Sequence, residues 1–413
     1  MVMEVYLVGG AVRDELLGLP VKERDWCVVG ATPDELEDLG YRPVGRDFPV
    51  FLHPETAEEY ALARTERKTA AGYHGFVFYT SPDVTIDEDL GRRDLTINAI
   101  ARNRNGELID PFNGRHDIDK KLLRHVSNAF AEDPVRILRT ARFAARFHSL
   151  GFRVADETMQ LMNDMVCNGE VDALVPDRVW KETEAALADS RPDVYFEVLH
   201  TCGALKAVFP EIEALFGVPQ PEKWHPEIDS GVHTLMVLQQ AALLSQDIDV
   251  RFAALVHDLG KATTRKSELP KHPGHEARSV RLIESLAKRL PVPNACRELA
   301  CLAAEFHTHC HRAFELRPST ILKVFDRADA FRRTERFDKL MLVCEADARG
   351  RTGLENRDYP QADFFRAARR AAADVEVNDL TAGDLTGAEI GKAIHKRRQH
   401  AVERFRKTYD PPK

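Results

Sequence analysis

The pattern of apolar and polar positions changes about a third of the way along the chain. Over the first ~110 residues, short apolar runs alternate with helix-like stretches, and glycine and proline separate them. This alternation predicts an α/β domain. The runs that we expect to form strands are Val5–Val8, Trp26–Val29, Val50–Leu52 and Phe76–Tyr79.

From Asp133 onward the pattern is that of long amphipathic helices that end at glycine or proline, with hardly a strand among them. We therefore expect an α/β head followed by an all-α neck and body and then a second all-α domain. The proline-rich stretch VPQPEKWHP favours a boundary near residue 225. The predicted segments are residues 1–135, 136–225, 226–350 and 351–413.

Composition adds the class of protein to this outline. The chain has 413 residues, of which 44% are hydrophobic and 30% are charged, as in a folded multi-domain protein. Because its first residues lack the pattern of a signal peptide and no apolar run could span a membrane, we expect a cytoplasmic protein with no membrane partner. The seven cysteines form no CxxC pair, which favours reduced thiols over a disulfide framework or a thiolate zinc site.

Two basic segments stand out against the net charge of −8. Residues 124–153 carry six arginines against two acidic residues, and residues 391–413 carry eight basic residues against two acidic ones. Clustered positive charge of this kind can bind a phosphate backbone although the whole chain is acidic. A solvated helix face is the alternative for either segment alone.

The stretch LVGGAVRDELLG places Gly9 and Gly10 between a predicted strand and a predicted helix. Small residues at such a turn let backbone N–H groups approach a phosphate, and Arg13 on the helix can add a bidentate grip. In the next predicted strand, Glu23 and Asp25 are two residues apart, so strand periodicity puts both carboxylates on one face. This arrangement predicts a divalent-cation site, although an E-x-D pair alone is more often surface charge.

Arginines follow in two further motifs. DLGRRDLTINAI carries Arg92 and Arg93, which we interpret as a clamp on a triphosphate. EDPVRILRTARFAAR predicts a helix that begins near Asp133 and Pro134. On that helix four arginines are spaced so that they lie within an arc of about 120° and can contact a triphosphate and an RNA strand. These arginines are Arg136, Arg139, Arg142 and Arg146.

Taken in order, GGAVRD…ExD, RRDLTINA and EDPVRILRTARFAAR resemble the class II tRNA nucleotidyltransferases, the CCA-adding enzymes of the polymerase-β superfamily. The resemblance implies a polymerase-β-like head and use of CTP, ATP, tRNA and Mg²⁺. It also links residues 63–68 and 72–79 to the switch from CTP to ATP. In the implied site, Glu23 and Asp25 bind Mg²⁺, Gly10 and Arg13 contact the nucleotide, Arg93, Arg139 and Arg142 hold the triphosphate, and Asp133 and Arg136 read the base.

One position departs from the family pattern. The first metal-binding carboxylate is ordinarily an aspartate, and here it is Glu23. Mg²⁺ requires near-ideal octahedral geometry, so an added methylene changes how this ligand reaches the ion. Asp25 is therefore the firmer ligand, and we expect reduced or altered metal use rather than an inactive enzyme.

A second constellation lies in the helical part of the chain. His233 lies on one predicted helix, and His257 and Asp258 follow the apolar run FAALV near the end of another. Histidine and carboxylate side chains at a helix end near the core are good ligands for a divalent metal. Structural histidines remain an alternative for some members of this set. Further histidines nearby are His272, His275, His307 and His311.

This second pattern resembles the HD phosphohydrolase superfamily, and its fusion to a CCA-adding head resembles the multifunctional CCA family of bacteria. The resemblance implies 2′,3′-cyclic phosphodiesterase, 2′-nucleotidase and phosphatase activities, the last favoured by nickel (Ni²⁺). Its implied catalytic and metal residues are His233, His257 and Asp258. Either Asp326 or Asp347 completes the ligand set.

The motifs assign a function to each predicted segment: the nucleotidyltransferase head, the RNA- and nucleotide-binding neck and body, the HD domain and a basic helical tail. A bacterial poly(A) polymerase shares the head motifs and is the nearest alternative. A catalytically weakened RNA-binding relative is the other. The sequence leaves open a monomer or a homodimer, and the addition of the full CCA or of part of it.

Overall fold

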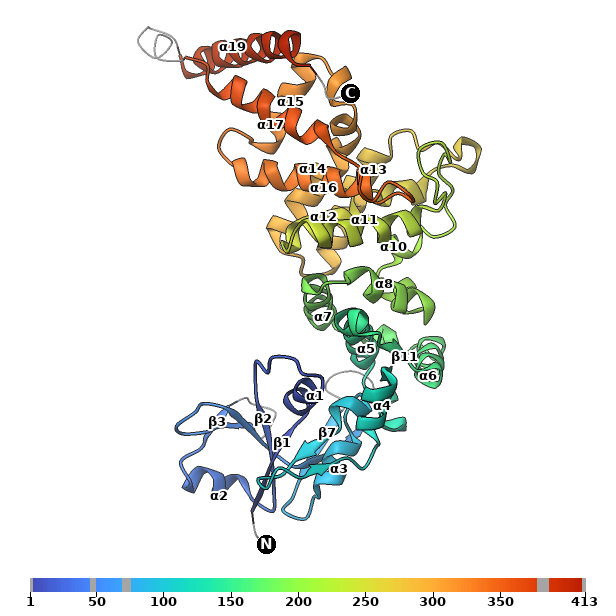
Figure 1. Cartoon of the computed structure of the whole chain (residues 1–413), viewed down its shortest axis with the longest axis vertical. Helices are drawn as coiled ribbons and strands as arrows, with labels where there is room; N and C mark the ends of the chain where they lie inside the picture. The colour runs from blue at the N-terminus through green and yellow to red at the C-terminus, as the bar shows by residue number, and fades with distance from the viewer. Residues whose placement is uncertain (1–2, 45–49, 69–75, 377–385, 411–413) are drawn as a thin grey trace. The chain divides into compact units, whose positions relative to one another are not determined.

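The structure is a computed structural model that describes residues 3–44, 50–68, 76–376 and 386–410, with the side chains of residues 66–68 and 76–78 left out. The described chain forms two compact units, which we treat separately (Figure 1). Unit 1 comprises Met1–Ala186 and Val194–Val208, and unit 2 comprises Leu187–Asp193 and Phe209–Lys413. The four-segment division expected from the sequence stays a prediction.

The head in unit 1 is built on a seven-stranded mixed sheet, counted over the described residues, with the order β3-β4-β5-β2-β1-β8-β9. Strand β2 lies antiparallel to β1 and parallel to β5. In this register Asp25 is opposite Val8 on one side and Glu59 on the other. The strands are β1 (Glu4–Val8), β2 (Asp25–Val29), β3 (Arg42–Val44), β4 (Val50–Leu52), β5 (Glu59–Leu62), β8 (Ala101–Arg102) and β9 (Leu108–Ile109).

Two helices cover opposite faces of this sheet, as the alternation of side chains along β1 requires. Tyr6 and Val8 pack into one core cluster together with Leu90 of α3. Val5 packs into another together with Leu36 of α2. Both helices begin with a capping box, in which a threonine and the glutamate three residues later exchange hydrogen bonds. The helices of the head are α1 (Gly10–Leu16), α2 (Pro33–Asp38), α3 (Ile86–Gly91) and α4 (Gly114–Lys120).

All four runs predicted as strands form strands, including β7 (Phe76–Thr80), which pairs with β6 (Arg64–Lys68) as a separate antiparallel ribbon. The prediction of an α/β head is confirmed. Residues 72–75 of the predicted base-switching loop lie outside the described residues.

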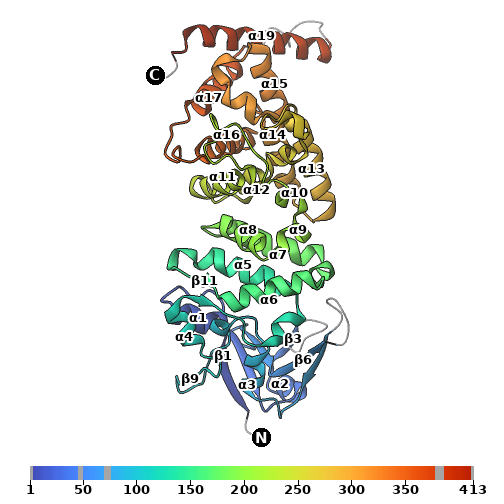
Figure 2. The same ribbon diagram turned by 90° about the vertical axis from the view of Figure 1, so that its right-hand side faces the viewer.

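After the head, unit 1 continues in helices (Figure 2), which confirms the predicted change of fold class. One exception is β11 (Arg153–Val154), a two-residue strand that pairs parallel to β10 (Leu122–Leu123). Such a short strand leaves no periodic signal in the sequence. The helices here are α5 (Val135–Phe147), α6 (Asp156–Cys167), α7 (Pro176–Ala188), α8 (Pro192–Thr201) and α9 (Ala204–Val208).

Unit 2 is built from helices, among which α11, α12, α14 and α16 pack together around a group of buried histidines. Within the described ranges, no helix is long and apolar enough to cross a membrane. The helices are α10 (Pro210–Glu213), α11 (Ser230–Leu244), α12 (Ile248–Val256), α13 (His275–Arg289), α14 (Asn294–His311), α15 (Pro318–Ala328), α16 (Thr334–Arg349), α17 (Pro360–Ala373) and α19 (Gly387–Thr408).

Candidate functional site

A polar cavity of about 650 Å³ lies in unit 1, between the head sheet and helices α5 and α7. It brings together every residue that the sequence assigned to the nucleotide site. These residues are Gly10, Arg13, Glu23, Asp25, Arg93, Asp133, Arg136, Arg139 and Arg142.

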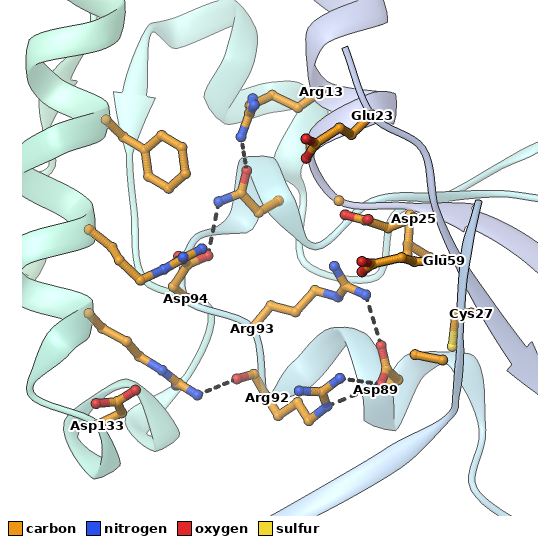
Figure 3. Close-up of a pocket in the computed structure, with 18 of the residues that line it drawn as sticks. Arg13, Glu23, Asp25, Cys27, Glu59, Asp89, Arg92, Arg93, Asp94 and Asp133 are labelled. Carbon is orange, nitrogen blue, oxygen red and sulfur yellow. Dashed lines mark hydrogen bonds and ion pairs between the residues drawn. The ribbon is translucent and has the colours of Figure 1, made fainter. Parts of the chain in front are cut away.

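Three carboxylates meet at one side of this cavity (Figure 3). Asp25 is the first residue of β2, whereas Glu23 precedes the strand, so the expectation that both share one strand face is wrong. Both side chains nevertheless line the same cavity. The third carboxylate is Glu59, the first residue of β5, which the sequence reading missed. Parallel pairing of β2 and β5 sets Glu59 directly opposite Asp25, a register that a single sequence does not reveal.

The donor set at this side consists of carboxylate oxygens, which suits a hard cation such as Mg²⁺. Desolvation raises the pKa of Asp25 and Glu23 adds to the rise, while Arg93 opposes it. The cost of gathering like charges is typical of a site that a cation completes.

Arg93 reaches the carboxylates because of Gly9. This glycine has φ = 67°, and a Cβ built on it would lie 2.7 Å from Nη1 of Arg93, so a side chain here would displace the guanidinium. Asp89 of α3 holds Arg93 from the other side, with 3.1 Å between Oδ2 and Nη2. Burial raises the pKa of Asp89, but Arg93 and Arg92 outweigh burial and lower the pKa to about 2. Asp89 is therefore ionised at neutral pH.

A chain of buried hydrogen bonds links the two predicted triphosphate-binding elements. Arg13 donates to Oδ1 of Asn98 at 2.6 Å, and Asn98 donates to Oδ1 of Asp94 at 2.9 Å. The other oxygen of Asp94 accepts from Nε of Arg139 at 2.7 Å. Burial opposes the charge on Asp94, yet Arg139 and these hydrogen bonds keep the pKa of Asp94 below its usual range. The motif RRDLTINA thus orients Arg13 and Arg139 toward the same cavity.

Two further arginines of α5 are held by acidic residues of unit 1. Arg142 donates from Nε to Glu182 of α7 at 2.6 Å, and Arg146 donates to Asp14 of α1 at 2.9 Å. Each pair leaves other N–H groups of the guanidinium to face the cavity that both arginines line. Three of the four arginines of the predicted basic stripe, Arg139, Arg142 and Arg146, are therefore already oriented by carboxylates.

The two residues predicted to read the base have different partners. Asp133 receives a two-pronged ion pair from Arg178 of α7, with contacts of 3.2 and 2.9 Å. Arg136 donates from Nη1 to the carbonyl of Ala129 at 2.8 Å and from Nη2 to the carbonyl of Arg92 at 2.7 Å. Arg178 was missed in the sequence, because it lies 45 residues after Asp133 and in no motif.

The second site lies in unit 2, where the described residues bring His233, His257, Asp258 and Asp347 together. His257 Nε2 lies 3.2 Å from Oδ2 of Asp258, and His233 Nε2 lies 3.2 Å from Oδ1 of Asp347. Asp347 of α16 therefore takes the position that the sequence left open. The alternative, Asp326 of α15, instead pairs with His395 of α19 at 3.3 Å.

Backbone carbonyls fix the orientation of these imidazoles. His257 Nδ1 donates to the carbonyl of Ala254 at 2.8 Å, and His233 Nδ1 donates to that of Gly350 at 2.9 Å. Carbonyls only accept, so the Nε2 lone pairs point toward the centre, as in metal-binding histidines. Both Nε2 atoms are buried and have no hydrogen-bond partner within the described parts of the chain.

The carboxylates of this centre are strongly acidic. Burial raises the pKa of Asp258, but Lys261 and His257 outweigh burial and keep it well below its usual range. Burial likewise opposes the charge on Asp347, and His311 and His257 keep its pKa well below its usual range. Two charged carboxylates beside imidazole nitrogens fit a divalent transition metal.

A cavity of about 180 Å³ opens onto this centre. His275 and His307 line it together with Lys261, whose Nζ lies 2.5 Å from Oδ2 of Asp258. His272 also lines it, but its ring nitrogens bond to Thr264 and to the carbonyl of Pro219, so it offers no free lone pair to the centre.

Family models match both units. The model of the poly A polymerase head domain matches residues 5–124 and the HD domain model matches residues 231–334. Between them, residues 151–216 match a model described as a probable RNA and SrmB-binding site of polymerase A. The fold and the two sites therefore define a nucleotidyltransferase head joined to an HD domain.

Relatives of known name match the whole chain. The multifunctional CCA protein of Thioalkalivibrio sulfidiphilus is 65% identical over 98% of this chain and 99% of its own length. That of Alkalilimnicola ehrlichii is 58% identical over 99% of each chain. The chain belongs to the multifunctional CCA protein family.

Solved structures share the fold. An apo CCA-adding enzyme superposes with a TM-score of 0.68 over 99% of this chain and 89% of its own, at 18% sequence identity. Other CCA-adding enzymes of this fold were solved with CTP, with ATP and, for the Thermotoga maritima enzyme, with tRNA, at TM-scores of 0.64, 0.66 and 0.64. At 18–20% identity these structures establish the fold alone.

Proposed function

We propose that unit 1 adds CCA to the 3′ end of tRNA from CTP and ATP, without a nucleic-acid template. The observation that carries this proposal is the single cavity in which three carboxylates face a set of pre-oriented arginines and the Asp133–Arg178 pair. The names of the two close relatives and the ligands of the solved CCA-adding enzymes support the choice of reaction.

In this proposal the carboxylates of Asp25, Glu23 and Glu59 hold Mg²⁺. The ions supply activation of the attacking 3′ hydroxyl and neutralisation of the leaving pyrophosphate. Arg93, Arg139 and Arg142 bind the triphosphate, and no step requires them to move far, because acidic partners already orient them.

Base selection falls to Asp133 and Arg136. A carboxylate accepts from the exocyclic amino group that cytosine and adenine share and uracil lacks, and a guanidinium donates to ring and carbonyl acceptors. Arg178 holds the carboxylate of Asp133 in one orientation.

The test uses tRNA that lacks its CCA end, incubated with CTP alone, ATP alone, UTP alone and CTP plus ATP. We expect two residues from CTP alone, the full three from the mixture and little incorporation of UTP. Long adenosine tracts from ATP alone would instead identify a poly(A) polymerase. Absence of any incorporation would favour the weakened RNA-binding relative.

We further propose that unit 2 is a metal-dependent phosphohydrolase with 2′,3′-cyclic phosphodiesterase, 2′-nucleotidase and phosphatase activity. The buried, correctly oriented histidines and the adjoining cavity favour it. A transition metal, with Ni²⁺ as our choice, supplies an activated water when bound. In this proposal Lys261, which contacts Asp258 and lines the cavity, binds the phosphate. The proposal places the enzyme in the cytoplasm, as a monomer or homodimer.

A further inference from the structure

We propose that the indole ring of Trp224 stacks against the base of a nucleotide whose phosphate occupies the cavity of unit 2. The proposal rests on the phosphohydrolase function proposed above and adds the residue that selects nucleotides among phosphate esters. Trp224 lies in the stretch VPQPEKWHP, which the sequence indicated only as a domain boundary.

Trp224 lies at the edge of this cavity. Pro221 and His225, which flank it in the sequence, both line the cavity. The backbone N–H groups of Trp224 and His225 both donate to the carbonyl of Pro221 at 3.0 Å, so the chain turns at this point. The ring of His225 lies 4.7 Å from that of His233, measured between ring centres. The segment thus runs from the cavity wall to a ligand of the proposed metal.

Arg351 connects the backbone of Trp224 with the metal centre. Its side chain lines the cavity, and its Nη1 donates to the carbonyl of Trp224 at 3.4 Å. Its Nη2 lies 3.6 Å from Oδ1 of Asp347. Because one guanidinium contacts both groups, Trp224 lies close to the centre that is proposed to bind the phosphate. A nucleotide bound there through its phosphate can extend its base to Trp224.

The indole ring itself is open to solvent. Trp224 is 59% exposed, although tryptophan is highly buried on average. Nζ of Lys223 lies 4.7 Å from the centre of the ring, a distance typical of a cation–π contact. Bases stack on exposed aromatic side chains in basic surroundings, since every base has a π face. The ring of Trp224 therefore has the chemistry of a stacking platform.

The size and polarity of the cavity place the base outside it. Its volume is about 180 Å³, whereas cavities that enclose ligands as large as a nucleotide have about 300–1,000 Å³. Within the described chain, Pro221 is the one lining residue without a polar or charged side chain. Such an interior suits a phosphate and a ribose. The flat, less polar base therefore remains at the mouth of the cavity, where Trp224 lies.

The segment that carries Trp224 also lies outside the part of unit 2 that resembles other HD domains. The HD domain model matches residues 231–334, and Trp224 precedes that range. Residues that bind a substrate are commonly carried on loops beside a rigid scaffold. Stacking on such a loop distinguishes a nucleotide from a phosphate ester of other chemistry, because only the nucleotide has a base.

The experiment compares two phosphate monoesters, of which one carries a base. The full-length chain with Ni²⁺ is given 2′-AMP or glycerol 2-phosphate, which both carry the phosphate on a secondary carbon, and phosphate release is measured. Trp224→Ala should raise KM for 2′-AMP by about tenfold without lowering kcat, and should leave both constants for glycerol 2-phosphate unchanged. Trp224→Tyr keeps an aromatic ring and should restore most of the affinity. Leu243→Ala is the matched control, because Leu243 is apolar, 73% exposed and on α11 of the same unit.

Inhibition by adenosine gives a second readout, which needs no turnover of a nucleotide. Adenosine should inhibit the hydrolysis of glycerol 2-phosphate by the parent chain, and about tenfold more weakly in Trp224→Ala. An unchanged KM for 2′-AMP in Trp224→Ala, or equal losses on the two substrates, would overturn the stacking role and leave the phosphohydrolase proposal intact. If the parent chain hydrolysed neither substrate, both proposals would be overturned.

Discussion

The two sites reach their charge balance in opposite ways. In unit 1 the carboxylates of Asp25 and Glu59 are exposed, and the arginines around them are already paired with acidic residues. In unit 2 the ligands His233 and His257 are fully buried, with unpartnered Nε2 atoms in the described structure. The first site can remain without a cation until a nucleotide arrives with its cations, because water solvates its exposed carboxylates. The second site contains buried polar atoms for which a bound ion would supply the missing partner.

The largest effect that we expect separates the two chemistries. Asp25→Ala should lower nucleotide incorporation by about 1,000-fold or more, because removal of a ligand takes away charge stabilisation of the transition state. His257→Ala should reduce hydrolysis of 2′,3′-cyclic AMP to background. Each variant should retain the other activity, measured on the same preparation. Loss of both activities in either variant would mean that the sites are not independent.

Removal of bound metal should change the thermal stability of the two units to different extents. When the concentration of free ion is about 1,000 times its dissociation constant, binding stabilises the folded state by about 4 kcal/mol. We therefore expect chelation to lower the melting temperature of unit 2 by several degrees and to leave unit 1 nearly unchanged. Scanning calorimetry with and without a chelator measures both transitions, and Ni²⁺ should restore the first. Equal shifts in the melting temperatures of the two units would contradict the idea that the site of unit 2 alone needs an ion for stability.

These contrasts also explain which parts were predictable from the sequence. Local motifs gave the head strands, the arginine helix and the position of His257 and Asp258, because each depends on spacing within a few residues. The pairing of Asp25 with Glu59 depends on strand register, and that of Asp133 with Arg178 on helix packing. No signal in one sequence reports such distant neighbours.

The choice between two aspartates shows the same limit. Asp326 and Asp347 both lie on helices of unit 2, and either carboxylate has suitable chemistry. Only the packing of α16 against α11 and α12 brings Asp347 to the histidines. Asp326 lies on α15 and pairs with His395 of α19 instead, although α15 also contacts α14 and α16.

Arg178 offers a smaller and more selective test. Arg178→Gln removes the ion pair that orients Asp133 and leaves the proposed metal ligands unchanged. We therefore expect a loss of base selection of about tenfold and a modest loss of rate. The measurement is the ratio of kcat/KM for CTP to that for UTP. Arg153→Gln is the control, since the side chain of Arg153 is 65% exposed and its ion pair, among the described residues, is with exposed Asp156. An unchanged ratio in Arg178→Gln would show that the pair is only structural.

The smallest effect concerns Glu23, where the chain departs from its family pattern. Because Glu23 precedes β2, its backbone is not held by the strand register that fixes Asp25, and its longer side chain must reach the ion from this looser segment. Glu23→Asp should therefore change the rate by about two- to fivefold and shift the Mg²⁺ concentration for half-maximal rate, since octahedral coordination tolerates little error. Titration of Mg²⁺ at saturating CTP measures both quantities, with exposed Glu55→Asp as the control. If the Mg²⁺ titration curves of Glu23→Asp and of the control both match that of the parent chain, the longer side chain of Glu23 has no effect on catalysis. Asp25 and Glu59 would then define the metal geometry.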